Sequence, residues 1–186
     1  MKLKKGKLSD AVWVLVILLL LFTPLGFHAR VHLMRLFSFS PKVEKQESYQ
    51  KITNYNWELI NINGEKVNLT SKKDNVLVIN YWATWCPPCV AEMPSLVALY
   101  NDYGNKVKFV FLASDDKAKV ETYLEKNRYK FPVFFELEKS PKILQAASLP
   151  TTYIIDKSGN VILKEIGAAN WNSKPIRALL DSLVIE

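Results

Sequence analysis

The chain has 186 residues, of which 49% are hydrophobic and 23% charged, a composition typical of a folded globular protein and not of a disordered or fibrous one. The formal net charge is +7, but the first 40 residues hold six of the 25 Lys and Arg residues and only one of the 18 Asp and Glu residues. The rest of the chain is nearly neutral, which excludes the basic surface that nucleic-acid binding requires. Two Cys residues are too few for a scaffold held by several disulfides.

The N-terminal region has the order of an export signal. Four lysines precede the twelve unbroken apolar residues Ala11–Phe22, and residues 25–27 follow after Pro24. As a helix, residues 11–27 would span about 25 Å, which is shorter than the roughly 30 Å hydrocarbon core of a bilayer. The segment can still cross the core if the long lysine side chains at its N-terminal end extend to the membrane surface. Because no small-x-small cleavage site follows closely, we expect residues 1–27 to be a signal anchor with one transmembrane helix. A cleaved signal peptide and a buried helix of a soluble protein remain as alternatives.

Residues 28–50 are expected to form a juxtamembrane segment and a linker. The segment His28–Phe39 has two interpretations, an interfacial helix lying on the membrane or a polar flank of the anchor. His28 and His32 have a spacing that can bind a metal ion, but no third ligand lies nearby in the sequence, which favours the polar flank. By the positive-inside rule, the N-terminal lysines stay in the cytoplasm and residues 51–186 lie outside the cytoplasmic membrane.

Residues 51–186 alternate between β-forming runs and segments with helical periodicity. Continuous apolar runs such as 75–82 and 107–113 are typical of strands buried on both faces of a sheet. Together these patterns predict one α/β domain with a mixed central sheet and an N-terminal hairpin. The expected strands are 57–60, 66–69, 75–82, 107–113, 132–137, 151–156 and 161–166, and the expected helices are 87–103, 117–128, 140–147 and 173–183.

Both cysteines lie in the pentapeptide Trp85-Cys86-Pro87-Pro88-Cys89, which follows a buried strand and opens a helix. A structural disulfide is a poor explanation, because closing so short a loop removes only ~2 kcal/mol of unfolded-state entropy, against roughly 4.7 kcal/mol for a 100-residue loop. A redox dithiol needs two neighbouring sulfurs at a helix N-terminus, where unpaired N–H groups and the helix dipole stabilise a thiolate. The pattern therefore indicates redox chemistry.

The residues around this motif provide little for a metal or cofactor. After residue 50 the chain has no His and no further Cys, so zinc would lack ligands, and Val90 stands where a c-type haem site needs His. A peroxidase would need a separate peroxidatic cysteine. We expect no metal and no cofactor, although a metal or copper carrier and a non-catalytic membrane-tethered binding module stay open as alternative functions.

Several of these features, at matching spacing, resemble the thioredoxin superfamily and within it the membrane-anchored TlpA/ResA-like thiol-disulfide oxidoreductases. The resemblance covers roughly residues 52–186 and implies a thioredoxin-like fold with an N-terminal hairpin extension. It rests on the segment Val78–Cys89, on Pro94 within the following helix, on Leu149-Pro150-Thr151 as a cis-proline loop, on the unit Phe131–Ala147 and on the Trp57 hairpin.

The resemblance and the position of the motif together suggest roles for the site residues. Cys86, at the helix start, is expected to be the exposed nucleophile, and Cys89, one turn further and more buried, to resolve the mixed disulfide, so that the pair cycles between dithiol and Cys86–Cys89 disulfide. The two prolines stiffen the loop without losing a needed N–H. The expected substrate groove consists of Trp85, Pro87, Pro88, Leu149, Pro150 and Thr151.

One position departs from thioredoxin. Asn80 stands where thioredoxin has a buried Asp, and an amide cannot exchange a proton. Glu92, three residues after Cys89 and similar to the TlpA/ResA branch's glutamate, is the candidate for the proton transfer that Cys89 needs. The alternative is a solvated surface glutamate that only favours the helix N-terminus.

These observations predict a single-pass protein of the bacterial cytoplasmic membrane whose thioredoxin-like domain reduces extracytoplasmic protein disulfides. Cytochrome c maturation is the family's commonest task, which makes apocytochrome c a candidate client and requires a membrane electron donor for the dithiol. A disulfide oxidase or isomerase is the alternative within enzymes, because the residues between the cysteines do not fix the direction.

Overall fold

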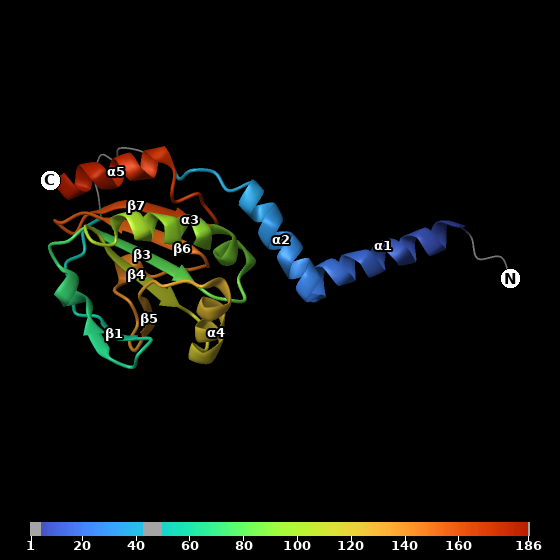
Figure 1. Cartoon of the computed structure of the whole chain (residues 1–186), viewed down its shortest axis with the longest axis horizontal. Helices are drawn as coiled ribbons and strands as arrows, with labels where there is room; N and C mark the ends of the chain where they lie inside the picture. The colour runs from blue at the N-terminus through green and yellow to red at the C-terminus, as the bar shows by residue number, and fades with distance from the viewer. Residues whose placement is uncertain (1–4, 43–49, 186) are drawn as a thin grey trace.

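The computed structural model describes residues 5–42 and 50–185, and part of the expected linker, 43–49, lies outside them (Figure 1). Two helices precede the domain, and seven strands and three helices build it, with two short 3₁₀ turns. The helices are α1 Lys5–Phe22, α2 Pro24–Leu36, α3 Pro87–Tyr103, α4 Lys117–Asn127 and α5 Lys174–Ile185. The strands are β1 Glu58–Asn61, β2 Lys66–Asn68, β3 Leu77–Trp82, β4 Lys108–Ala113, β5 Val133–Glu136, β6 Thr151–Ile155 and β7 Val161–Ile166, and the turns are η1 Leu69–Lys72 and η2 Lys142–Leu144.

The strands form one mixed sheet in the order β2-β1-β5-β4-β3-β6-β7. β3 pairs in parallel with β4 and antiparallel with β6, so β3 lies inside the sheet and all six of its residues are buried. Alternation along β3 sends Val78, Asn80 and Trp82 to one face and Leu77, Ile79 and Tyr81 to the other. The predicted mixed sheet and its hairpin extension are thereby confirmed.

The two faces of the sheet are covered differently. One face packs against apolar residues of α3, α4 and α5 in a cluster that also contains both cysteines. The other face is covered by the segment before β1 and by the two 3₁₀ turns, through residues such as Trp57, Leu69 and Leu144. Asn80 therefore faces the side on which α3 lies.

The helix α3 begins and ends where its sequence predicts. Cys86 is its N-cap residue in an extended conformation, and Pro87 and Pro88 occupy the first turn, where a missing N–H leaves no intrahelical bond unmade. Pro94 lies inside the helix, and the helix ends at Tyr103 before Gly104.

The expected single N-terminal helix over residues 11–27 is wrong in its extent. α1 ends at Phe22, and Thr23 caps α2 by accepting a hydrogen bond at Oγ1 from the Gly26 N–H at 3.2 Å. Pro24 then occupies the first position of α2, where its fixed φ suits a helix start and not a helix interior. Within the described residues no single helix has the length and apolarity to cross a bilayer, and the pair 12–19 and 24–36, bent by 76°, meets both only when taken together.

The helix expected at 140–147 is also wrong. Only Lys142–Leu144 form a 3₁₀ turn, and Gln145 is already extended. Pro141 precedes the turn without a capping hydrogen bond, and the Tyr153 hydroxyl donates to the Gln145 carbonyl at 2.9 Å, so a tertiary contact holds this segment extended in place of a second helical turn.

Candidate active site

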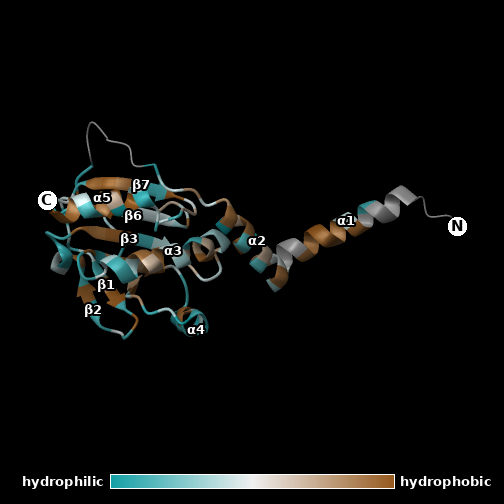
Figure 2. Ribbon diagram, turned by 45° about the horizontal axis from the view of Figure 1, so that its top comes forward, coloured by the Kyte–Doolittle hydropathy of each residue, from teal (hydrophilic) through white to brown (hydrophobic). Residues whose placement is uncertain are grey.

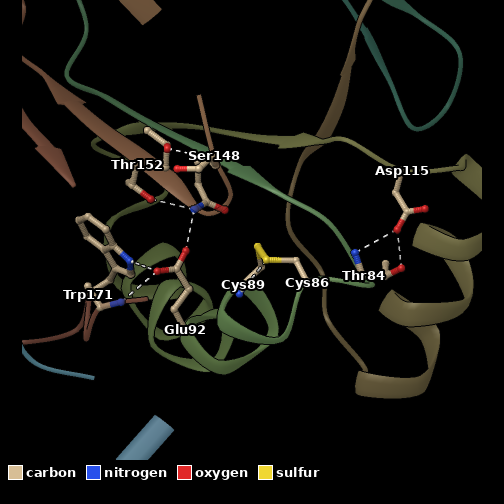
Figure 3. Close-up of a disulfide and its surroundings, with 11 residues drawn as sticks. Thr84, Cys86, Cys89, Glu92, Asp115, Ser148, Thr152 and Trp171 are labelled. Carbon is tan, nitrogen blue, oxygen red and sulfur yellow. Dashed lines mark hydrogen bonds between the residues drawn. A yellow bond between two sulfur atoms is a disulfide. The ribbon is translucent and has the colours of Figure 1, made fainter. Parts of the chain in front are cut away.

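The cysteines lie where β3 passes into α3. β3 ends at Trp82, and Cys86 and Cys89 form a disulfide whose Cα atoms are 5.3 Å apart, at the N-terminus of α3 (Figure 3). The Cys89 N–H points at the Cys86 sulfur, 3.3 Å away, so a helix N–H group faces this sulfur as expected for a stabilised thiolate. Cys86 is only 4% exposed and Cys89 fully buried. Cys86 is thus the more accessible sulfur, but less exposed than the sequence suggested.

The loop before the cysteines is fixed by a carboxylate from the neighbouring strand. Asp115 follows β4, and its Oδ2 accepts hydrogen bonds from the Thr84 N–H at 3.0 Å and from the Thr84 hydroxyl (Figure 3). Sequence analysis did not identify Asp115. Its signal was available, because side chains that follow adjacent parallel strands meet at one edge of the sheet.

The cis-proline loop lies at the same edge. The Leu149–Pro150 peptide bond is cis, and the next residue, Thr151, pairs with Tyr81 of β3. Leu149 packs against the apolar cluster that contains both cysteines. The Thr151 side chain is buried and donates to the Ser148 carbonyl at 2.7 Å, and its backbone lies in β6 between Tyr81 of β3 and Ile166 of β7.

Trp85 is the most exposed residue of the motif, with 60% of its surface accessible, and Pro87 and Pro88 beside it are half-buried. An indole so exposed next to a redox disulfide offers apolar contact area to an incoming chain.

Glu92 is buried, with 1% of its surface exposed, so the alternative of a solvated surface glutamate is wrong. Three donors surround its carboxylate (Figure 3). The Asn80 side-chain amide donates to Oε1 at 2.9 Å, while the Trp171 indole N–H and the Ala169 backbone N–H donate to Oε2 at 2.8 and 3.1 Å. All three groups stabilise the ionised form of the carboxyl.

Burial and these hydrogen bonds act on the carboxyl in opposite directions. Burial raises the pKa of Glu92 to about 8, the hydrogen bonds from Trp171, Ala169 and Asn80 oppose that rise, and the charge of Glu165 adds to it. The group therefore changes its protonation state near neutral pH, as a group that exchanges protons with a thiol should.

Asn80 can serve Glu92 in both protonation states. Its Nδ2 also donates to the Thr152 hydroxyl at 2.8 Å, and its buried Oδ1 has no partner among the described residues. When the amide rotates by half a turn, Oδ1 can accept the proton of the neutral acid, and the Thr152 hydroxyl can accept or donate as required. Asn80, which stands where thioredoxin has an Asp, is thus the hydrogen-bond partner of the Glu92 carboxyl on α3.

The other members of the Glu92 cradle could not be found from the sequence. Ala169 and Trp171 are 77 and 79 residues away along the chain, and Thr152 reaches the site through Asn80. No local pattern marks them, because only the packing of the loop after β7 against α3 brings them together. In the part of the chain that the structure describes, no three His, Cys, Asp or Glu side chains gather as metal ligands would.

A dithiol–disulfide pair at a helix N-terminus, next to a cis-proline loop on this sheet, defines a thioredoxin-like protein. Comparison of the sequence with models of known protein families agrees, since the family described as AhpC/TSA matches residues 50–164. The chain belongs to this family.

Similar proteins of known activity define the class of enzyme more closely. The chain is 36% identical over 117 residues to the thiol-disulfide oxidoreductase ResA of Bacillus cereus, a match that covers 60% of this chain and 66% of the relative. With ResA of Bacillus thuringiensis it shares 32% identity over 165 residues, 86% of this chain and 88% of the relative. The thiol:disulfide interchange protein of Chlorobium tepidum superimposes with a TM-score of 0.59 at 22% identity, over 74% of this chain and 99% of that one. The protein is a thiol-disulfide oxidoreductase of the thioredoxin-like class.

The burial of Glu92 predicts a specific pH dependence of stability for the oxidised protein. Below about pH 4.5 the group is protonated in both states, and between there and about pH 8 the unfolded chain loses the proton while the folded one keeps it. The free energy of unfolding of the wild type should therefore fall across this window, by up to about 1.4 kcal/mol per pH unit, and then level off. Glu92→Gln should lack this slope.

Urea unfolding of both oxidised proteins at pH 5, 6.5 and 8 checks this expectation, with the disulfide removing any thiol titration. If the unfolding free energies of the two proteins run parallel across the window, Glu92 is ionised in the fold throughout and the prediction is wrong.

Proposed function

We propose that the protein reduces protein disulfides outside the cytoplasmic membrane through the Cys86/Cys89 pair, with Glu92 as proton acceptor for Cys89. The observation that supports this most directly is the buried Glu92, which lies one helical turn from Cys89 and whose pKa burial raises to about 8. A structural disulfide would need no such group.

The reaction is a pair of thiol–disulfide exchanges. The Cys86 thiolate attacks one sulfur of the substrate disulfide, which breaks and releases a thiolate while a Cys86–substrate disulfide forms. Cys89 gives its proton to Glu92 and attacks the Cys86 sulfur, which releases the second substrate thiolate. Two electrons pass to the substrate, and the protein is left with the Cys86–Cys89 disulfide present in this structure. A membrane dithiol donor returns the pair to the reduced form by the reverse exchange.

The proposed docking groove follows from the same edge of the sheet. Trp85 gives exposed apolar area, Pro87 and Pro88 border the disulfide, and the cis-proline loop Leu149-Pro150-Thr151 lies at the same edge of the sheet, with Leu149 just ahead of the strand pairing that begins at Thr151. An extended substrate segment beside this loop can pair through main-chain hydrogen bonds. Such bonds depend little on the amino-acid sequence of the client. A haem-binding Cys-x-x-Cys segment in its oxidised form, as in apocytochrome c maturation, fits such a site as the client.

The N-terminal helices support membrane attachment. The described side chains of α1 from Val12 to Leu19 are exposed and apolar, and Figure 2 shows α1 extending away from the domain with a hydrophobic stretch in its middle. α2 turns from it by 76° and has exposed Leu25, Leu33 and Leu36 on the face opposite its buried Val31. We propose that α1 anchors the protein and that α2 lies at the interface, with those leucines toward the lipid.

The cysteine roles predict unequal reactivity in the reduced protein. Cys86 should have the lower pKa and react with iodoacetamide much faster than Cys89 at neutral pH, because the Cys89 N–H at the helix start faces its sulfur and it is the more accessible of the two. Cys89→Ser should accumulate client mixed disulfides through Cys86, with Cys86→Ser as the matched control that traps none. Peptide mapping of the alkylated protein measures both rates, and faster labelling of Cys89 would reverse the assignment.

The role of Glu92 predicts a change in thiol titration. Glu92→Gln should lower the pKa of the cysteines, because a neighbouring carboxylate disfavours a thiolate, and should slow turnover because Cys89 loses its proton acceptor. Thiolate absorbance against pH, together with the rate of disulfide reduction, tests this. Superimposable titration curves and equal rates would exclude the role.

A redox titration of the same protein tests the direction of the reaction. A potential near the ≈ −270 mV of thioredoxin supports a reductase, and one near the ≈ −120 mV of DsbA would instead make the protein an oxidase.

The orientation of the chain predicts activity of an exported reporter. Alkaline phosphatase fused after residue 186 should be active, because the four lysines before the apolar run Ala11–Phe22 hold the N-terminus in the cytoplasm. An inactive fusion would contradict the orientation, and a mature N-terminus near Pro41 would show cleavage in place of an anchor.

A further inference from the structure

The helix α2 does more than connect α1 to the domain. It packs along α3, the helix that carries Cys89 and Glu92, and its Val31 is 4% exposed. Residues 37–41 then run along the domain surface to the loop after β7. We call α2 together with residues 37–41 the N-terminal brace.

The brace reaches the loop that holds Glu92. Residues 169–171 of this loop alternate in direction, since Ala169 and Trp171 donate inward to Glu92 while the Asn170 N–H donates outward to the Phe39 carbonyl of the brace at 2.9 Å. Next to this contact, the hydroxyls of Ser40 and Ser173 share a hydrogen bond of 2.7 Å. Three consecutive residues thus lie between the brace and the buried carboxyl.

A cavity of about 190 Å³ lies between the brace and α3. Arg35 and Ser38 line it from the brace, Ala91, Pro94 and Ser95 from α3, and Ala169 and Asn170 from the loop. Glu92 lies in the same stretch of α3, between two of these lining residues. If the brace moved away, this cavity would become open surface and water would approach the carboxyl through the loosened loop.

We propose that the N-terminal brace is a positioning element of the redox site, which holds the 169–171 loop closed over Glu92 and keeps its carboxyl out of water. The proposal rests on the function proposed for Glu92. It makes the acid–base behaviour of the cysteine pair depend on how the anchor segment is seated on the domain. The Cys86/Cys89 pair and the N-terminal brace are then functionally coupled.

The direction of the effect follows from the balance of forces on Glu92. Burial is the largest influence and raises its pKa, whereas the donors of the loop lower it less. Hydration after release of the brace removes the larger influence, so the pKa should fall. The charge of Glu165 on β7 also raises the pKa of the carboxyl. Arg35 of the brace lines the cavity next to Ala91, and the disulfide-bonded Cys86 and Cys89 lie at the start of α3.

The test uses the full chain in detergent micelles with glutamate labelled by ¹³C at the side-chain carboxyl. The Glu92 signal is assigned by its absence in Glu92→Gln and is followed against pH. Val31→Asp, which puts a charge into the contact with α3, should lower the midpoint of this titration by about one pH unit or more. Leu137→Asp is the control, because Leu137 is 45% exposed on the domain after β5, outside the brace, and the same charge there should leave the midpoint unchanged.

A gentler variant protects the test against misfolding. Val31→Ala combined with Ser40→Ala removes apolar contact and one hydroxyl without adding charge, and should shift the midpoint in the same direction by a smaller amount. If Val31→Asp folds and its Glu92 midpoint equals that of the wild type, the proposed role of the brace is wrong. If Val31→Asp does not fold, the same conclusion follows when the double alanine variant has the wild-type midpoint.

The thiol titration of Glu92→Gln separates this failure from that of the proposed function. If Glu92→Gln alters the cysteine titration but Val31→Asp leaves the Glu92 midpoint in place, the role of Glu92 stands and the brace is refuted. If Val31→Asp moves the midpoint while Glu92→Gln leaves the cysteines unaffected, the brace positions Glu92 but Glu92 does not serve the cysteines.

Discussion

The burial of one carboxyl group among three hydrogen-bond donors organises this structure. Glu92 sits on α3 with 1% of its surface exposed, and an unpaired charge there would be strongly destabilising. β3 contributes the Asn80 amide, and the loop after β7 contributes the Ala169 and Trp171 donors. The sheet, the active-site helix and the last loop must therefore all be in place before this group is satisfied. Folding of the core and assembly of the redox site are in this sense the same event.

The position of that carboxyl also explains the departure at Asn80. The strand has an amide, Asn80, where thioredoxin has an acid. The nearby buried carboxyl is that of Glu92 on α3, and the Asn80 amide donates a hydrogen bond to it at 2.9 Å. Our proposal makes this carboxyl the proton acceptor that Cys89 would otherwise lack. An amide paired with a hydroxyl, as Asn80 is with Thr152, adapts to either protonation state, which a second carboxylate could not do without repulsion.

Most strands and helices were predictable because their signals are local. The apolar run of β3, the periodicity of α3 and the turn before β7 each depend on neighbours within a few residues. One error has a local cause, since Thr23 and Pro24 start a new helix inside an apolar stretch. The error at 140–147 does not, because a contact from the distant Tyr153 accompanies the extended conformation at Gln145. Asp115 was missed although its position after β4 was visible, because its importance depends on which strand lies beside β3.

The sequence by itself determined the chemistry: two cysteines three positions apart at a helix start can only be neighbours, and their spacing follows from helix geometry. It also indicated Glu92 as the carboxyl group nearest to Cys89 along the chain. Only the tertiary structure decided whether that carboxyl was buried and which groups held it, because Trp171 and Ala169 are nearly 80 residues distant and reach it through packing. Burial is a property of what surrounds a residue, and the sequence near Glu92 contains no record of the loop and the N-terminal segment that close over it.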